Sequence, residues 1–239
     1  MCGPGPGDPL APDRRASAEG ALVVRHAVVG PFAENTWVAA CSRTREAMLV
    51  DPGGELDRVL PLVAQGGFAV RRIVLTHGHV DHVCGAAEAK RVTGAPIQMH
   101  AADRDWLAAL PRQMDMFGLE GDRTVPEVDH WHEDGEALSL GALSGRILHV
   151  PGHSGGSCAL WFEEARAVFT GDTLFAGSVG RTDLPGGDFE ALRRSIVERL
   201  FPLGEEVRFH PGHGPSGTLG EERRTNPFVG EDAPRGGFL

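Results

Sequence analysis

Residues 75–82, LTHGHVDH, place three histidines and one aspartate within six positions, directly after the apolar run that ends at Leu75. Imidazole and carboxylate groups are the side chains that zinc, iron and similar ions bind. In an extended segment His77 and His79 point to the same side, because side chains alternate along a strand. Asp81 and His82 follow a turn and could serve a neighbouring position at the start of a helix. One loop cannot close a metal site, so other segments must supply further ligands.

Three later segments repeat this arrangement, in which an apolar, strand-like run ends in a glycine-containing loop. GRILHV runs into PGHSGG, RAVFT into GDTLFAG, and EVRFH into PGHGPS. Strands fix positions while the loops at their ends carry chemistry, so we expect the four loops to converge at one sheet edge. The candidate ligands are too many for one tetrahedral ion and suit two. They are His77, His79, Asp81, His82, His153, Asp172 and His213.

The other six histidines have no such motif around them, and we interpret them as ordinary surface or hydrogen-bonded side chains. They are His26, His100, His130, His132, His149 and His210.

Composition indicates the broad class of protein. The chain has 239 residues, 41% hydrophobic and 23% charged, which is typical of one large soluble domain. Its formal net charge of -10 argues against a nucleic-acid partner. There is no signal-peptide stretch and no apolar run approaching about 18 residues, so we expect a cytoplasmic protein without a membrane partner. Oligomeric state is not predicted by any pattern.

Glycine, proline and charge dominate both ends, which predicts a disordered leader at 1–20, a flexible tail at 230–239 and a domain at 21–229. Within the domain, residues 21–30, 35–42 and 46–53 are spaced as meandering antiparallel strands. Residues 55–67 have helical spacing, although Pro61 is expected to kink or shorten that helix. Residues 188–200 form a second amphipathic helix, with Asp188 as its cap.

The motifs THGHVDH, PGHS, GDTLF and PGHG resemble, in order, the ligand motifs of the metallo-β-lactamase-fold superfamily, and the match covers about residues 21–229. The resemblance implies an α/β fold, the αββα sandwich of two mixed β-sheets flanked by helices. It implies that His77, His79 and His153 hold a first divalent ion. It further implies that Asp81, His82 and His213 hold a second, and that Asp172 bridges both. Zinc is expected, although such ligands also accept iron or manganese.

Further segments, FAGSVGRTDLPGGD, EERRTNPF and the insert LAALPRQMDMFGL, resemble the short, single-domain glyoxalase II-like hydrolases. This resemblance implies a metal-dependent hydrolase of small acyl thioesters, like a hydroxyacylglutathione hydrolase. A hydroxide shared by two metals would attack the carbonyl carbon, with Asp81 and Asp172 as catalytic residues. Glutathione itself is in doubt, because the family's glutathione contacts include tyrosines and this chain contains none.

The roles of several further residues stay open. Asp51, in LVDPGG, either orients a metal-bound histidine or only forms a turn. Arg181, in GRTD, either binds a substrate carboxylate or forms a structural ion pair with Asp183. Trp106 and the insert residues around Phe117 either line an acyl pocket or pack the core.

The same residues allow two alternatives to a thioester hydrolase. Persulfide dioxygenases share the fold, and in that alternative His77, His153 and Asp172 would hold a single iron. The Pro-Gly-His-Gly segment around His213 favours the hydrolase. A metal-binding module without catalysis is the third interpretation, and the complete ligand set argues against it. Lactam-cleaving members of the fold usually carry Cys or Ser in place of Asp172, which argues against antibiotic hydrolysis.

Overall fold

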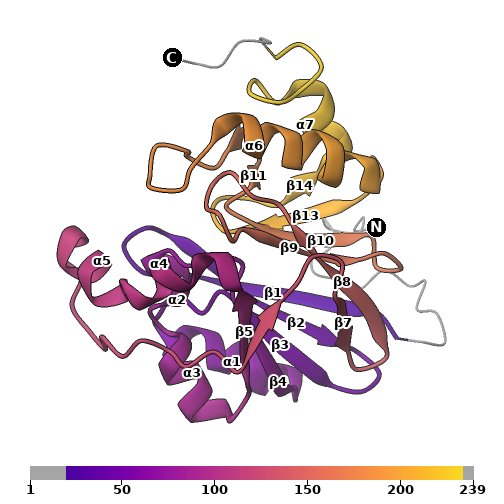
Figure 1. Cartoon of the computed structure of the whole chain (residues 1–239). Helices are drawn as coiled ribbons and strands as arrows, with labels where there is room; N and C mark the ends of the chain where they lie inside the picture. Colours follow the sequence, from indigo (N-terminus) through magenta and orange to yellow (C-terminus); the bar gives the residue numbers. More distant parts are fainter. Residues whose placement is uncertain (1–19, 234–239) are drawn as a thin grey trace, which may run out of the picture.

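The computed structural model describes residues 20–233, which form two mixed β-sheets stacked face to face, with helices on both outer sides (Figure 1). The first sheet has the order β1-β2-β3-β4-β5-β6. Its strands are β1 (Leu22–Val29), β2 (Glu34–Cys41), β3 (Glu46–Val50), β4 (Ala69–Val74), β5 (Ile97–His100) and β6 (His130–His132). Strands β1 to β3 pair antiparallel and β3 to β6 pair parallel.

The second sheet has the order β14-β13-β10-β9-β8-β7. Its strands are β7 (Ala137–Leu140), β8 (Leu143–His149), β9 (Cys158–Phe162), β10 (Ala167–Gly171), β13 (Arg208–Pro211) and β14 (Gly217–Thr218). Only β10 and β13 pair parallel, and the other neighbours are antiparallel. A short ribbon of β11 (Leu174–Phe175) and β12 (Ser178–Val179) follows β10.

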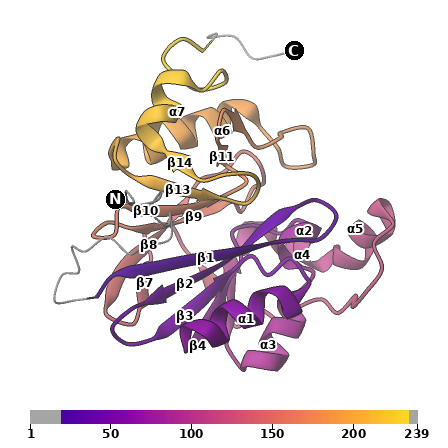
Figure 2. The ribbon, with the colours of Figure 1, turned by 180° about the vertical axis from the view of Figure 1, so that it is seen from behind.

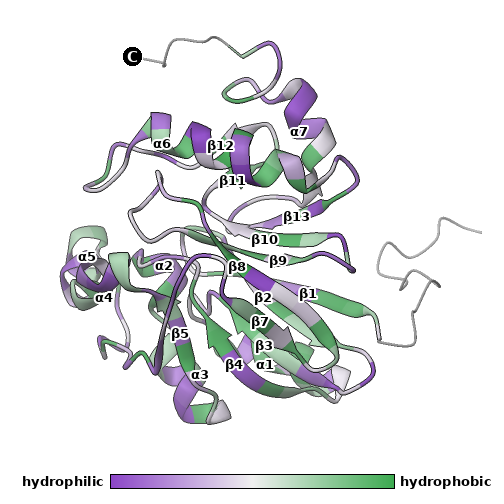
Figure 3. Cartoon of the chain, turned by 45° about the vertical axis from the view of Figure 1, so that its right-hand side comes forward, coloured by the Kyte–Doolittle hydropathy of each residue, from purple (hydrophilic) through white to green (hydrophobic). Residues whose placement is uncertain are grey.

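Strand alternation explains the layers. In β3, Leu49 packs into the cluster under the first sheet's helices, whereas Met48 and Val50 pack into the cluster between the sheets. In β9, Leu160 faces the first sheet and Trp161 faces the opposite helices. Both faces of these strands are buried, so the strands are apolar except for Glu46 at the start of β3 (Figure 3).

Helices α1 (Leu56–Gly66) and α3 (Ala86–Thr93) cover the first sheet (Figure 2). Helix α6 (Phe189–Arg194), its continuation 195–200 and α7 (Leu219–Thr225) cover the second. The short helices α2 (Val80–Val83), α4 (Arg104–Ala108) and α5 (Leu110–Phe117) gather at one end of the sandwich (Figure 1). The expected αββα sandwich is therefore confirmed.

The expected antiparallel meander of the first three strands is confirmed, and so is the Asp188 cap, whose Oδ1 accepts a hydrogen bond from Ala191 N–H at 2.9 Å. The expectation for Pro61 is wrong in part, because α1 is not shortened and continues to Gly66. Pro61 lies on the exposed side of the helix, so the carbonyl that loses its intrahelical partner can bond to water.

The four motif-bearing loops follow β4, β8, β10 and β13, as expected, but they do not share one sheet. Strand β4 belongs to the first sheet and the other three belong to the second. The loops still meet because the sheets are joined at this end, where the Cys158 N–H donates to the Thr76 carbonyl at 2.9 Å. The site is thus at the seam between two sheets.

Residues 1–19, which are nearly all of the predicted leader at 1–20, lie outside the described residues. The same is true of residues 234–239, the last part of the predicted tail at 230–239. Within the described part of the tail, Gly230 N–H donates to Asn226 O and Glu231 N–H donates to Arg223 O, both at 2.8 Å. Across residues 20–233, no helix has the length and apolar character needed to cross a bilayer.

Phe169 tests the packing between the sheets. Its side chain is fully buried there, and its ring contacts those of Trp37, Phe162 and His210. Phe169→Ala should lower the free energy of unfolding by about 3–5 kcal/mol, because it removes apolar contacts and leaves a cavity. Val92→Ala, at a position that is 54% exposed, is the control and should change it by less than about 0.5 kcal/mol. Denaturant unfolding measures both, and equal small effects would contradict a core at this place.

Candidate metal centre

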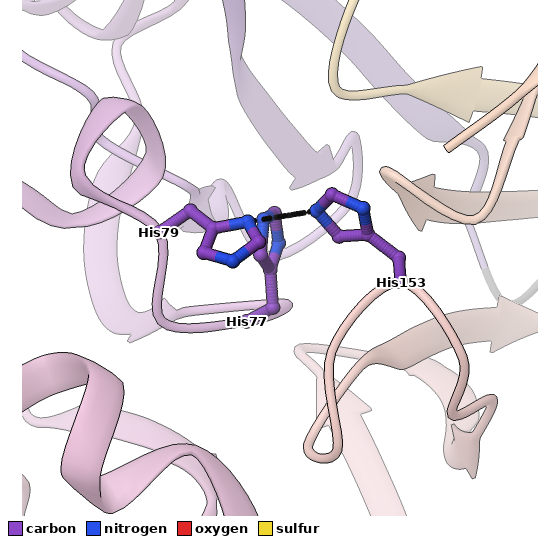
Figure 4. A group of neighbouring side chains, drawn as sticks. All are labelled: His77, His79 and His153. Carbon is purple, nitrogen blue, oxygen red and sulfur yellow. Dashed lines mark hydrogen bonds between the residues drawn. The ribbon is translucent and has the colours of Figure 1, made fainter. Parts of the chain in front are cut away.

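Three histidines from two loops form the first half of the site. The rings of His77 and His79, which follow β4, and of His153, which follows β8, point toward one another (Figure 4). His79 Nδ1 lies 2.8 Å from His153 Nε2, which lies 3.2 Å from His77 Nε2. All three side chains are buried.

The second half of the site combines Asp81, His82 and His213. His213 Nε2 lies 3.2 Å from Asp81 Oδ2, and His82 Nε2 lies 3.7 Å from the same oxygen. Asp81 and His82 come from the start of α2, whereas His213 follows β13. This half is more open, because the His213 side chain is 25% exposed.

Asp172 lies between the two halves. Its Oδ1 is 3.3 Å from His82 Nε2, and its Oδ2 is 3.7 Å from His153 Nε2 and 3.5 Å from His213 Nε2. One carboxylate therefore contacts a histidine of the first half and two of the second. The structure brings together all seven candidate ligands.

The donor atoms of the first half fit a cation. Burial lowers the pKa of His77 well below its usual value and that of His79 to about 3, so these imidazoles are uncharged. Their ring nitrogens converge on one point, as the ligands of a bound cation do. Among the described residues, two atoms where the halves meet, His82 Nε2 and Asp172 Oδ1, lie 3.3 Å apart and are buried without a hydrogen bond, although buried polar atoms are normally paired. Imidazole and carboxylate donors of this kind suit zinc, iron or manganese.

The second half has the opposite electrostatic character. Burial lowers the pKa of His213, but its contacts with Asp172 and Asp81 outweigh burial and raise the pKa to about 9. For His82 the same balance, burial against Asp172 and Asp81, raises the pKa well above its usual value. Burial raises the pKa of Asp172, but the neighbouring His82 and His213 hold it well below the usual value. Without an ion, these histidines therefore carry protons at neutral pH.

Asp51 contacts this half directly. Its Oδ2 lies 3.0 Å from His82 Nδ1 and accepts a hydrogen bond from Thr76 Oγ1 at 2.6 Å, while its Oδ1 accepts one from Thr76 N–H at 2.7 Å. The carboxylate thus leaves His82 Nε2 facing Asp81 and Asp172. Asp51 has a left-handed backbone (φ 50), which aspartate tolerates better than most residues. Of the two interpretations of Asp51, a residue that orients a metal-bound histidine or one that only forms a turn, the contact with His82 matches the first.

Two backbone carbonyls have an equivalent effect on other histidines. His153 Nδ1 donates to the Arg181 carbonyl at 2.8 Å, and His213 Nδ1 donates to the Phe32 carbonyl at 3.1 Å. Each bond leaves Nε2 as the free nitrogen that faces the cluster. The Arg181 guanidinium instead pairs with Asp183 through two contacts of 2.7 Å, as in the structural interpretation.

Asp103, which sequence reasoning missed, ties the two histidine loops together. It is completely buried, its Oδ2 accepts from Gly78 N–H at 2.9 Å and from Ser154 Oγ at 2.6 Å, and its Oδ1 accepts from Gly156 N–H at 2.6 Å. Gln113 adds to this support, because its Oε1 accepts from Val80 N–H and its Nε2 donates to the Gly78 carbonyl. No motif surrounds Asp103, so the only signal is a carboxylate between two apolar segments.

The insert residues divide between packing and the rim. Met114 is buried in the core, whereas Phe117 is 42% exposed and its ring lies edge-on to Phe32, with centroids 5.2 Å apart. The Trp106 ring lies edge-on to His79 at 4.6 Å. Trp106 therefore packs against a ligand histidine, and Phe117 packs against Phe32, whose carbonyl accepts a hydrogen bond from His213.

Gly212 is required by a close approach. A Cβ at this position, within the Pro-Gly-His segment, would overlap Asp172 and the ring of His82. Its amide also donates to the Gly171 carbonyl at 2.8 Å, and its carbonyl accepts from Asn35 N–H at 2.7 Å. The glycine thus lets the backbone pass against the ligands.

The comparisons with known proteins agree with this geometry. The family model of the metallo-beta-lactamase superfamily matches residues 29–219, and the chain belongs to that superfamily. Membership supports a metal-dependent hydrolase. The chain is 39% identical, over 188 residues, to the hydroxyacylglutathione hydrolase GloC of Haemophilus influenzae, covering 77% of this chain and 88% of that protein.

Two solved structures are also similar. A B3 metallo-beta-lactamase, BLEG-1, superposes with a TM-score of 0.80 at 32% identity, covering 86% of this chain and 99% of that one. A di-iron-bound form of TTHA1623 superposes with a TM-score of 0.77 at 38% identity, covering 86% and 100%. The resemblance to this superfamily is therefore confirmed.

Asp103→Asn should weaken metal retention about 10–100-fold, the usual effect of losing a group that supports metal ligands. Both oxygens of the Asp103 carboxylate accept hydrogen bonds from the two loops, whereas the asparagine amide has only one acceptor oxygen. The loops that carry His79 and His153 therefore lose part of their shared anchor. Asp105→Asn, on an exposed neighbouring position, is the matched control. Elemental analysis after dialysis against graded chelator measures retention. Wild-type retention in Asp103→Asn, with unchanged circular dichroism, would contradict the anchoring role.

Ion binding to the second half should depend on pH. His213, with a pKa of about 9, must lose its proton before Nε2 can bind an ion. Affinity should therefore rise with pH up to about 9, by roughly tenfold per pH unit for each proton displaced, and fall as pH is lowered. Calorimetry in buffers of different ionisation enthalpy counts the protons released. Zinc binding without proton release at pH 7 would contradict protonated second-half histidines.

Proposed function

We propose that this protein hydrolyses small acyl thioesters with two divalent ions, most simply zinc. His77, His79 and His153 would hold the first ion and Asp81, His82 and His213 the second, with Asp172 shared. The observation that carries the proposal is the contact of one carboxylate, Asp172, with histidines of both halves. When bound, such a pair of ions supplies a water whose pKa is lowered from 15.7 towards about 7, and positive charge for a developing oxyanion.

The side chains divide the remaining work. Asp172 sets the spacing of the two halves, which is why it is proposed as catalytic. The Asp81 side chain is 19% exposed and hydrogen-bonds to His213, which supports a role at the side where water and substrate enter. Asp51 and the Arg181 carbonyl keep His82 and His153 in the orientation that the ions need. The Arg181 side chain is proposed to be structural.

A thioester suits this set of residues. Its thiol, with a pKa near 8.5, can leave as a thiolate without a dedicated general acid. An ester is harder, because an alkoxide leaves less readily. The apolar rim of Trp106, Phe117 and Phe32 supports recognition of an acyl group. The similarity to GloC makes S-lactoylglutathione the first substrate to assay.

Persulfide oxidation with one iron is the competing function, because His77, His153 and Asp172 would also serve as a two-histidine, one-carboxylate iron site. The position of His213 supports the hydrolase instead, since its Nε2 lies within 3.5 Å of both Asp81 and Asp172. Iron content alone does not separate the two functions, because the similar TTHA1623 structure holds two irons. Oxygen consumption separates them.

Hydrolysis of S-lactoylglutathione and of a short acetyl thioester is the expected activity, with the matching oxygen ester and a chromogenic β-lactam turned over far more slowly. Asp172→Ala should lose bound metal and reduce the rate by about 10³-fold or more, as expected when a central electrostatic group is removed. Asp57→Ala, exposed on α1, is the control and should behave as wild type.

Metal content must be measured on the same samples. An Asp172→Ala variant that keeps both ions and full turnover would refute the shared role of Asp172. One iron per chain, with persulfide-dependent oxygen uptake and no thioester hydrolysis, would overturn the hydrolase.

A further inference from the structure

A second group of metal-ligating side chains lies outside the seven-residue cluster. His130 and His132 are on β6, an edge strand of the first sheet, and Glu136 is in the turn that leads to β7, an edge strand of the second. One ligand atom from each of the three lies within 4.8 Å of the others. Because the histidines are two positions apart on a strand, they project from the same face.

Glu136 is held by its own turn in a position to serve both rings. Its Oε2 accepts a hydrogen bond from Glu133 N–H at 3.0 Å. Its Oε1 lies 2.6 Å from His130 Nε2 and 3.4 Å from His132 Nδ1. One oxygen thus faces two ring nitrogens, whereas the other is fixed by the backbone.

Hydrogen bonding within the group is incomplete. His132 is 3% exposed, and burial lowers its pKa, so its imidazole is uncharged. Its Nε2 is buried without a hydrogen-bond partner among the described residues. The other nitrogen, Nδ1, faces Glu136 Oε1 at 3.4 Å, which is a long contact for a hydrogen bond. A neutral, underused imidazole beside a second imidazole and a carboxylate is a set of donors for a cation.

We propose that His130, His132 and Glu136 bind a further divalent transition-metal ion, separate from the catalytic pair. Two imidazoles and a carboxylate suit zinc, and also copper or nickel. His130 is 48% exposed, so water can complete the coordination. Arg72 lies near enough to act on His132 electrostatically, and its positive charge opposes cation binding there.

The site would join the edges of the two sheets. Strand β6 ends at His132, and Glu136 directly precedes β7, so an ion bound to both spans the crossover between the sheets. Edge strands lack a partner on one side. A bound ion would therefore stabilise the fold at the place where the chain passes from one sheet to the other.

The test counts ions on the full chain. Equilibrium dialysis against zinc up to about 0.1 mM, followed by elemental analysis, should find one more zinc per chain in wild type than in His130→Ala or Glu136→Gln. Both substituted residues are on the surface side of the group, so folding is expected to be retained. His26→Ala, which removes an exposed histidine from β1, should bind as wild type does.

Thermal unfolding provides the second measurement. Adding zinc should raise the unfolding midpoint of the wild type by more than it raises the midpoint of either variant, because an ion that binds only the folded state stabilises it. Equal zinc content in wild type, His130→Ala and Glu136→Gln would overturn the site. Because the result is a difference between variants with an intact catalytic cluster, it does not depend on thioester hydrolysis.

Discussion

The gathering of seven polar side chains, four of them buried, at the seam between two sheets is the constraint on which this structure depends. Each buried polar group costs free energy unless it is paired, and a neutral imidazole has only one N–H to donate, so three of them facing one another cannot satisfy every nitrogen. The first half of the cluster is a set of neutral donors, and the second half is a network of carboxylates and protonated histidines. Cations resolve both conditions, since they bind the free lone pairs and replace the protons.

Precision in such a site comes from the groups behind the ligands. Asp51, Asp103 and the carbonyls of Arg181 and Phe32 belong to four different segments. Three of them contact a histidine nitrogen directly. Asp103 instead holds the loop that carries His77 and His79 against the loop that carries His153. Asp51 and Asp103 are buried, so their contacts with the ligand loops are shielded from water. The more exposed second half is where substrate can approach.

Much of the fold followed from local pattern. The strand-like runs in 35–42 and 46–53 predicted two of the antiparallel strands, and Asp188 predicted the start of a helix. The seven candidate ligands could also be chosen from sequence, because each follows an apolar run and the motifs resemble those of one superfamily. The expected shortening at Pro61 was wrong, because the helix continues past an exposed proline whose lost hydrogen bond water can replace.

The sequence by itself determined which segments become strands, where the loops fall and which histidines lie in motifs, because these features are encoded by neighbours a few positions apart. Only the tertiary structure decided that loops from two sheets meet, that Asp103 supports a glycine 53 positions away, and that the Arg181 carbonyl orients His153. The same holds for Glu136, whose carboxylate turns back to two histidines of an edge strand. Such contacts depend on how the sheets stack and where the turns point, and no local periodicity carries that information.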